Sequence, residues 1–263
     1  MLNPIKWLEL ELKRNVTRAI LDTEKNLQNK KKREQKRLRE GRNHVIYYFH
    51  QVDDPYSHLC AQTLPLIAKT YDVEIKTFLV PSPTKEAAPE PDLLKSHSLE
   101  DAKIIAPHYG FTFPSVNELP NDKIIQMAQW AFVCMENPSF EDIIKIGDLL
   151  WKNDQSSISD LFSEPLNEEI VDSTLSRNSK LRKNFGHYLG GVFVYEGECY
   201  LGIDRLSLLE KRLADLGAKK DEKAKVIQRR PSDVQAIINL GLELDILWSA
   251  RSPYSYLAMK QLR

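Results

Sequence analysis

The amino-acid sequence predicts an α/β domain that carries an all-helical insert and is preceded by a long N-terminal helix. A strand–helix–strand pattern opens the domain over residues 44–80, and helical periodicity fills its middle. A hairpin followed by a helix closes it over residues 192–216. The order of elements is therefore βαβ, helical insert, ββα, and the opening unit requires two parallel strands.

The opening unit begins with a short apolar segment. Residues 44–49 are β-branched and aromatic, which favours a buried strand. Asp54 and Pro55 are the residue types preferred as the N-cap and first residue of a helix, which we expect to run to about Lys69. A second strand is expected over residues 73–80.

The middle of the chain is expected to start with an irregular loop, residues 81–97, which is rich in proline and charge. Helices are expected after it over residues 98–109, 123–135, 140–151, 159–162 and 167–177. Ser139 and Asp142 form a capping-box pattern before the helix that starts at residue 140. These helices predict an insert at about residues 85–185.

The end of the domain shows a hairpin and a final helix. Residues 192–195 and 198–201 alternate around Glu196 and Gly197, which predicts a hairpin. Asp204 then has the position of an N-cap for a helix that runs to Leu216, with Gly217 as its stop.

The charge of the chain is unevenly distributed. Lys plus Arg and Asp plus Glu number 37 each among 263 residues, so the net charge is zero. Residues 30–42 nevertheless hold eight basic and two acidic residues, which leaves the rest at −6. We expect one helix over residues 4–41, within a basic extension that covers residues 1–43. It is either a solvated helix that docks on the domain, which we favour, or a phosphate-binding arm. Because the net charge of the whole chain is zero, a nucleic-acid partner is not expected.

The cysteine content and the hydropathy pattern indicate the cellular compartment of the protein. Cys60, Cys134 and Cys199 are scattered, with no C-x-x-C pair and no zinc-site spacing. Such usage favours a reducing compartment, and we expect the cytoplasm. The apolar runs are shorter than the roughly 18 residues of a membrane span, so no membrane partner is expected.

The start of the domain is repeated near the end of the chain. Residues 244–257 echo residues 46–59 at a constant offset of 198, about one domain length. The aligned residues are Pro55, Tyr56, Ser57 and Leu59 with Pro253, Tyr254, Ser255 and Leu257. We therefore expect a domain over residues 44–217, a linker over 218–243, and the start of a second, truncated copy over 244–263.

These features together carry a family resemblance. The element order, Asp54-Pro55-Tyr56-Ser57 and Gly202-Ile203-Asp204-Arg205-Leu206 resemble the DsbA-like branch of the thioredoxin fold. Within it the chain looks most like kappa-class glutathione transferases and 2-hydroxychromene-2-carboxylate isomerases. The resemblance implies glutathione as cofactor, a small aromatic substrate, and the second DsbA-like domain or a homodimeric copy as partners.

The resemblance also implies site residues. Redox members carry Cys-x-x-Cys where this chain has Asp54 and Ser57, so dithiol exchange is excluded in this copy. In glutathione-using members a serine before the proline faces the sulfur, and Ser252 matches it in the second copy. Catalytic candidates are therefore Ser252, Asp54 and Ser57. Cofactor-binding candidates are Pro55, Tyr56, Gly190, Gly191 and Asp204.

Three of these positions carry open alternatives. Asp54 is either a structural helix cap or a group that contacts the ligand. Gly191 falls where the family has a cis-proline, although a cis bond without proline is costly. Asp204 either meets the γ-glutamyl end of glutathione or caps its helix.

The sequence thus supports more than one function. The first is a glutathione-dependent isomerase or transferase. The alternatives are a degenerate, non-catalytic module that supports a catalytic second copy, and a relative of thiol–disulfide oxidoreductases that lacks their cysteines.

Overall fold

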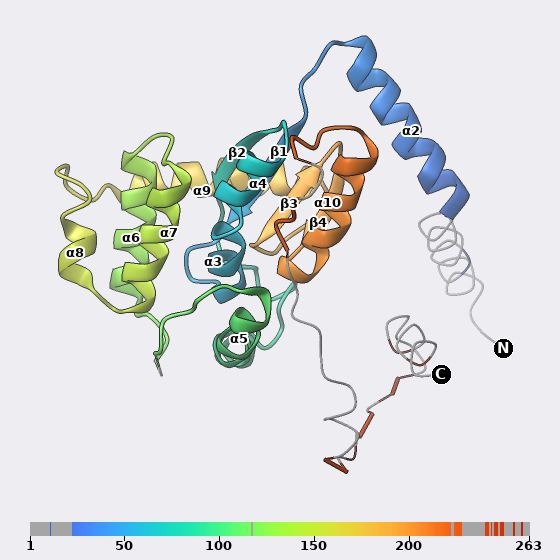
Figure 1. The fold of residues 1–263 in the computed structure, drawn as a ribbon. Helices are drawn as coiled ribbons and strands as arrows, with labels where there is room; N and C mark the ends of the chain where they lie inside the picture. Colours follow the sequence, from blue (N-terminus) through green and yellow to red (C-terminus); the bar gives the residue numbers. More distant parts are fainter. Residues whose placement is uncertain are drawn as a thin grey trace. The chain divides into compact units, whose positions relative to one another are not determined.

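The computed structural model describes residues 23–116, 118–221 and 224–227, together with single positions such as Glu11 and some between 240 and 259. The chain divides into two compact units, Met1–Arg229 and Arg230–Arg263. The elements described below all belong to the first unit (Figure 1).

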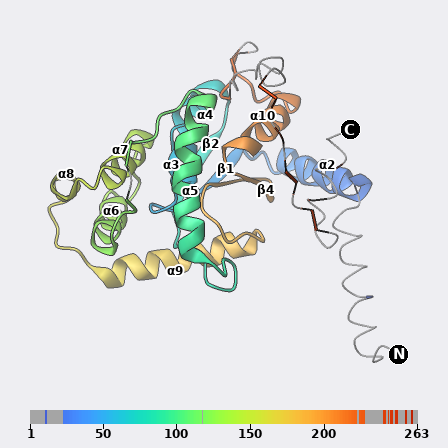
Figure 2. The same cartoon turned by 90° about the horizontal axis from the view of Figure 1, so that it is seen from below.

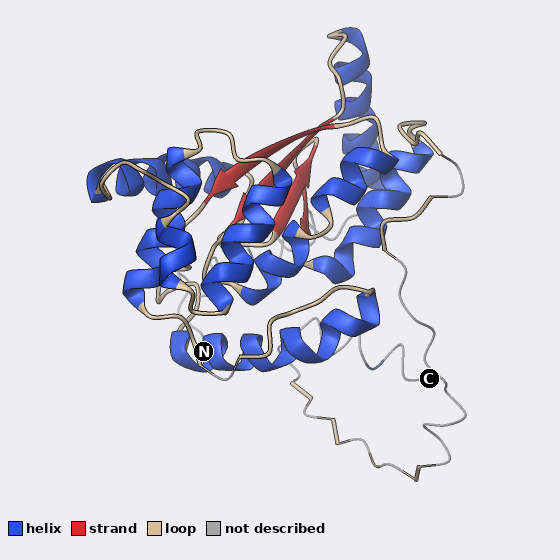
Figure 3. Cartoon of the chain, turned by 60° about the vertical axis from the view of Figure 1, so that its left-hand side comes forward, coloured by secondary structure: helices blue, strands red, loops and turns tan. Residues whose placement is uncertain are grey.

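A four-stranded mixed sheet forms the centre of this unit (Figure 3). Its strands are β1 (Val45–His50), β2 (Glu74–Leu79), β3 (Val192–Tyr195) and β4 (Glu198–Leu201). Their order is β2-β1-β3-β4, with β1 and β2 parallel and the other two pairs antiparallel. This topology, with helices inserted between β2 and β3, is that of a thioredoxin fold, and the predicted fold class is confirmed.

Helices surround the sheet and form the insert (Figures 1 and 2). They are α2 (Thr23–Arg39), α3 (Pro55–Ala61), α4 (Leu64–Thr70), α5 (Pro91–Ile105), η1 (Ala106–Tyr109), α6 (Asp122–Cys134), α7 (Phe140–Trp151), α8 (Gln155–Ser159), α9 (Glu168–Asn184), η2 (Ile203–Arg205) and α10 (Leu206–Asp215). None of the described helices is both long and apolar enough to cross a membrane.

The side chains of β1 alternate between two apolar layers, as strand geometry requires. Ile46 and Tyr48 are fully buried in the main core, which also contains α3, α4, α6 and α7. Phe49 joins a smaller cluster on the opposite face, where Leu181 and Phe185 of α9 and the segment after it pack against the sheet. The sheet is thus covered on both faces, and only its ends and loops remain for a site.

The helix expected over residues 55–69 is two helices. The break falls at Gln62 and Thr63, where the Thr63 hydroxyl donates to the carbonyl of Cys60 (2.6 Å). Pro65 has no amide hydrogen, and its ring would clash with the carbonyl of Ala61 in a continuous helix, so α4 begins anew just before it.

The insert differs from the prediction in its boundaries. The expected loop over residues 81–97 ends early, because Pro91 is the first residue of α5, where a missing amide hydrogen costs nothing. The capping box of Ser139 and Asp142 is confirmed, with both bonds present. The helix expected over residues 159–162 lies earlier in the chain, as α8 (Gln155–Ser159). The helix expected over residues 167–177 is longer than predicted, because α9 continues to Asn184.

Some predictions lie partly or wholly outside the described residues. Of the helix expected over residues 4–41, the structure describes Thr23–Arg39. The second copy expected over residues 244–263 is described at isolated positions only, so it stays a prediction.

Candidate functional site

The site is built around the start of α3, immediately after β1. Asp54 has an extended backbone (φ −109°, ψ 114°), and its carboxylate accepts hydrogen bonds from the amides of Tyr56 (3.3 Å) and Ser57 (2.9 Å). Pro55 occupies the first helical position and needs no amide partner. The predicted cap is confirmed, and it fixes the carboxylate at the helix start.

Ser57 lies beneath this carboxylate and is fully buried. Its hydroxyl donates to Asp54 Oδ2 (2.7 Å) and accepts from the amide of Gln51 (3.3 Å). Gly190 covers it, since a Cβ at Gly190 would lie 2.6 Å from Ser57 Oγ. The Ser57 hydroxyl therefore makes its hydrogen bonds to protein groups and holds the Asp54 carboxylate in place. It does not point to a ligand.

Asp54 is the titratable group that this arrangement leaves at the edge of the site, partly exposed. Burial raises the pKa of its carboxyl to about 6, and the nearby charge of Asp53 raises it further, while the bonds from Ser57 oppose the shift. Such a group gains and loses a proton close to neutral pH, which is what general acid–base chemistry requires.

The loop before β3 forms the opposite wall. Gly191 has φ +62°, and the described residues contain no cis peptide bond, so the cis-proline that the sequence resemblance implies has no counterpart among them. A Cβ at Gly191 would lie 3.4 Å from the amide nitrogen of Ser57. Gly190 and Gly191 are both buried and serve the close packing of this loop on α3.

A hydrogen-bond network joins α5 to the start of α3. The buried Asp53 carboxylate accepts from Ser82 Oγ (2.8 Å) and Gln51 Nε2 (3.1 Å), and Lys95 Nζ lies 3.3 Å from it. The hydroxyl of Tyr56 donates to Asp101 Oδ2 (2.7 Å) on α5. The insert is therefore fastened beside the site, and Tyr56 lies at the junction.

Asp204 has a different environment from the one predicted. The N-cap of η2 is Gly202, with φ +74°, and no side chain caps this helix or α10. The Asp204 side chain is 63% exposed and pairs with its neighbour Arg205 (3.3 Å). The predicted cap is therefore wrong, because Asp204 lies inside a 3-10 turn rather than before the helix.

Two buried histidines, His50 at the end of β1 and His58 on α3, were not among the predicted site residues. Tyr48 donates its hydroxyl hydrogen to the carbonyl of Ser57 (2.6 Å), so His50 Nδ1, 3.1 Å away, must be the donor in that contact. Burial lowers the pKa of His50 to about 3, which keeps it neutral. His58 Nε2 lies 3.1 Å from Asp148 Oδ1 on α7. These residues support the floor of the site.

The polar run after β1 was also overlooked. Gln51 and Asp53 follow the carboxyl end of an apolar strand, which is where ligand sites gather in α/β folds. That signal could have added both to the prediction. The role of Gly190 as a cover could not be found in this way, because it depends on a contact between distant segments.

No cysteine lies at the start of α3, so no thiol of this chain is available there for redox or nucleophilic chemistry. Cys60, one turn into the helix, is fully buried, and burial raises the pKa of its thiol well above the usual range. The three cysteines of the chain are unpaired. Within the described part of the chain, no group of three His, Cys, Asp or Glu side chains could hold a metal ion.

Ser252 lies outside the described residues, so its surroundings stay a prediction. A nearby contact in the second unit is described, however. The amide of Ser249 donates to Ser255 Oγ (3.3 Å), as the amide of Gln51 does to Ser57 Oγ (3.3 Å). The two pairs are separated by the same offset as the sequence repeat, so the repeat includes this contact.

A pocket of about 260 Å³ is found elsewhere, between the loop after η1 and the end of α7. Its lining residues include Val116, Leu119 and Trp151, and none of the predicted site residues. It is therefore not part of the site at α3.

Comparison with known proteins gave matches to structures only. No known protein family matches the sequence, and no curated protein resembles it significantly. A 2-hydroxychromene-2-carboxylate isomerase structure is similar with 15% identity over 66% of this chain and 96% of the other, at a TM-score of 0.43. The disulfide reductase DsbM from Pseudomonas aeruginosa is similar with 12% identity over 65% and 98%, at a TM-score of 0.44.

A third similar structure is that of a probable DsbA oxidoreductase from Streptomyces coelicolor, with 10% identity over 69% of this chain and 94% of the other, at a TM-score of 0.47. This chain has a thioredoxin fold. That statement rests on the strand order and directions given above.

Proposed function

We propose that this chain is a DsbA-like protein of the non-redox type, a glutathione-dependent isomerase or transferase that acts on small aromatic substrates. The observation that carries the proposal is Asp54, a carboxylate with a pKa of about 6 at the position where redox relatives place sulfur. The fold and the family motifs support it, and the three unpaired cysteines favour a reducing compartment such as the cytoplasm.

The residues at α3 fit a thiol ligand in their acid–base chemistry. An ionised Asp54 beside a thiolate would be a like-charge pair. An Asp54 that accepts the thiol proton at its carboxylate becomes neutral, and the repulsion disappears. Glutathione would supply the nucleophilic sulfur. Asp54 would hold its proton and return it at the end of the cycle, so no oxidant or reductant is needed.

Other residues would hold such a ligand by charge and contact. Lys95 is the cation fastened beside the site through Asp53, and it suits a ligand carboxylate. Tyr56 offers an aromatic face next to Asp54 and is held in place by Asp101. Ser57, Gly190 and Gly191 would act indirectly, by fixing the carboxylate and closing the floor.

The test is calorimetric titration of glutathione into this chain and into its Asp54→Asn variant, in buffers of different ionisation enthalpy. We expect binding that transfers a proton to the chain near pH 7, and loss of that transfer in the variant. S-methylglutathione, which has no thiol proton, is the matched control ligand. If titration with glutathione releases or absorbs no heat, glutathione is not a ligand of this chain and the proposal is wrong.

A second candidate is the degenerate module that supports a catalytic second copy. The committed hydroxyl of Ser57 and the absence of a cis-proline among the described residues favour it. Turnover of a hydroxychromene carboxylate by Asp54→Ala and Ser252→Ala variants distinguishes the two. Loss with Ser252→Ala alone supports the module, and loss with Asp54→Ala alone refutes it.

A further inference from the structure

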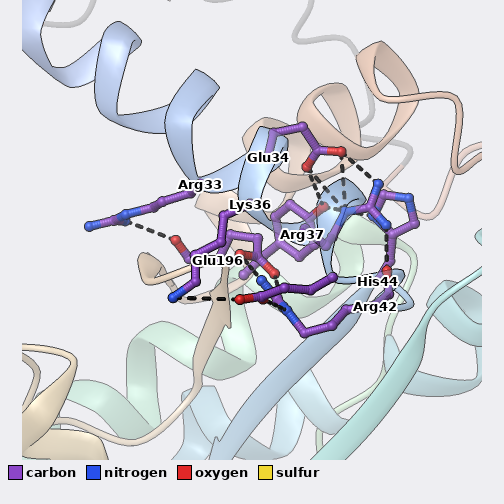
Figure 4. Close-up of polar contacts among 9 residues, drawn as sticks. Arg33, Glu34, Lys36, Arg37, Arg42, His44 and Glu196 are labelled. Carbon is purple, nitrogen blue, oxygen red and sulfur yellow. Dashed lines mark hydrogen bonds and ion pairs between the residues drawn. The ribbon is translucent and has the colours of Figure 1, made fainter.

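The basic helix α2 has a contact face. Lys30, Arg33 and Arg37 recur at helical spacing, so they share one side. Lys30 pairs with Glu198, and Arg33 Nη1 donates to the carbonyl of Glu196 (2.8 Å). These two contacts hold α2 on the β3–β4 hairpin. Figure 4 shows the one between Arg33 and Glu196.

The end of α2 is fastened in the same way. Arg37 bonds Glu34 (2.6 Å) and the carbonyl of Arg42 (2.7 Å), while Arg42 pairs with Glu196 (2.8 Å). Figure 4 shows these side chains directed toward one another. Lys36 pairs with Glu40 (3.8 Å) and Arg39 Nε donates to the carbonyl of Gln35 (3.4 Å), so six of the eight cations of residues 30–42 have protein acceptors. This is expected for the docked helix rather than the phosphate-binding arm.

Another face of α2 is uncovered. Leu27 and Leu38 are 53% and 62% exposed, and Lys31 lies on the same side between them. Lys31 and Lys32 are exposed and have no ion-pair partner among the described residues. Lys32 lies about 100° further round the helix than Lys31, at the edge of the same uncovered surface. We name Leu27, Lys31, Lys32 and Leu38 together the basic stripe.

A face of opposite charge lies on the insert. Residues 160–172, from the end of α8 into the first turns of α9, hold five acidic residues and no basic one. The acidic residues are Asp160, Glu164, Glu168, Glu169 and Asp172, and all five are exposed. Within the part of the chain that the structure describes, none of them forms an ion pair. Ile170 follows Glu169 in the chain, is 45% exposed, and lies about 100° further round α9 at the edge of this surface. We name these six residues the acidic face.

We propose that the basic stripe of α2 packs on the acidic face of a second copy of this chain. The two surfaces match in both respects, since each combines uncompensated charge with exposed aliphatic side chains. Within one copy, α2 is held on the hairpin by Lys30, Arg33 and Arg42, and no described contact joins it to α8 or α9.

Charge balance favours a second copy over a nucleic acid. Residues 30–42 carry +6 and the rest of the chain −6, so a polyanion would be repelled by most of the molecule. A second copy instead offers each surface its complement, and two such contacts related by a two-fold axis would close the assembly. In such a dimer the positive charge of residues 30–42 would lie against negative charge of the other copy.

The experiment measures the dimer dissociation constant by sedimentation velocity of this chain at low and high salt. We expect a dimer that weakens as salt screens the charges. Lys31→Glu with Lys32→Glu, or Glu168→Lys with Glu169→Lys, should each raise the dissociation constant about tenfold or more. Combining all four changes should restore it.

Two controls keep the result interpretable. Lys69→Glu reverses an exposed charge on α4 and should leave the dimer unchanged. Glu168 and Glu169 also favour the α9 dipole, so Glu164→Lys, which lies before the helix, provides a second test of the acidic face. A monomer at every concentration, or a dimer indifferent to both reversals, would overturn the proposal. So would loss of binding to a single-stranded RNA probe on reversal of Lys31 and Lys32 without a change in oligomeric state.

Discussion

Two aspartates stand at two helix starts of this molecule, and the sequence predicts the same role for both. Asp54 has an extended backbone before α3, and its carboxylate accepts two amide hydrogens. Asp204 lies within η2, and its carboxylate extends to solvent and to Arg205. The first is a cap and the second is not.

The difference shows what a cap requires beyond residue type. The N-cap must precede the first helical turn with an extended backbone, so that its side chain can fold back on the amides. At η2 this position belongs to Gly202, two residues before Asp204, and its positive φ leads the chain into the turn at Ile203. Packing then separates the two aspartates further, because Gly190 covers the floor beneath Asp54 while Asp204 stays exposed.

The largest effect is expected from filling the floor at Asp54. In Gly190→Ala the new Cβ would lie 2.5 Å from Gln51 Cβ and 2.6 Å from Ser57 Oγ, so the loop must move. We expect a loss of about 2–3 kcal/mol in the free energy of unfolding, measured by denaturant titration.

Gly110→Ala is the control for that measurement, because Gly110 has φ +77° and open space around it and reports backbone strain alone. Gly190 has no positive φ, so its cost must be steric. A Gly190→Ala variant as stable as the parent protein would contradict the packing described at α3.

The next effect compares the two aspartates directly. Asp54→Ala removes an acceptor of two amide hydrogens and should lower the free energy of unfolding by about 1–2 kcal/mol. Asp204→Ala removes an exposed side chain and should change it by less than about 0.5 kcal/mol. Equal losses in thermal or denaturant unfolding would show that the two helix starts do not differ.

A smaller effect is expected in the pH dependence of stability. The folded protein holds the pKa of Asp54 at about 6, above its ordinary value, so folding favours the protonated form. The contribution is complete below about pH 4 and is lost as pH rises through about 6. Asp54→Asn keeps a capping oxygen and lacks this titration.

The measurement is the free energy of unfolding of the parent protein and Asp54→Asn between pH 4 and pH 7. The advantage of the parent over the variant should fall by about 1 kcal/mol, since solvent screens a partly exposed carboxylate. Asp204→Asn removes the same charge from the other helix start and is measured alongside. An advantage that grows as pH rises would contradict a raised pKa at Asp54.

The smallest effect concerns Ser57. Its hydroxyl donates to Asp54 and favours the ionised carboxylate, so Ser57→Ala should raise the pKa of Asp54 by up to about one unit. Carbon-13 NMR titration of the aspartate carboxyls measures this. Ser82→Ala removes a hydroxyl from the neighbouring Asp53 and is the matched control. A lowered pKa in Ser57→Ala would refute the role given to this serine.

Much of the architecture followed from local patterns. The apolar strand before Asp54, the hairpin around Glu196 and the capping box of Ser139 each depend on residues close in sequence, and each is confirmed. Boundaries failed where a proline admits two interpretations, as at Pro91, which begins α5 although a proline-rich stretch predicts a loop.

Some features of the candidate site follow from local sequence and others from tertiary contacts. The sequence by itself determined the fold class, the cap at Asp54 and the absence of sulfur at the start of α3, because these depend on residue type and short-range spacing. Only the tertiary structure decided that Ser57 is covered by Gly190, that burial raises the pKa of Asp54 to about 6, and that Asp204 is exposed. These properties arise from burial and from contacts between segments far apart in the chain, and no local pattern encodes them.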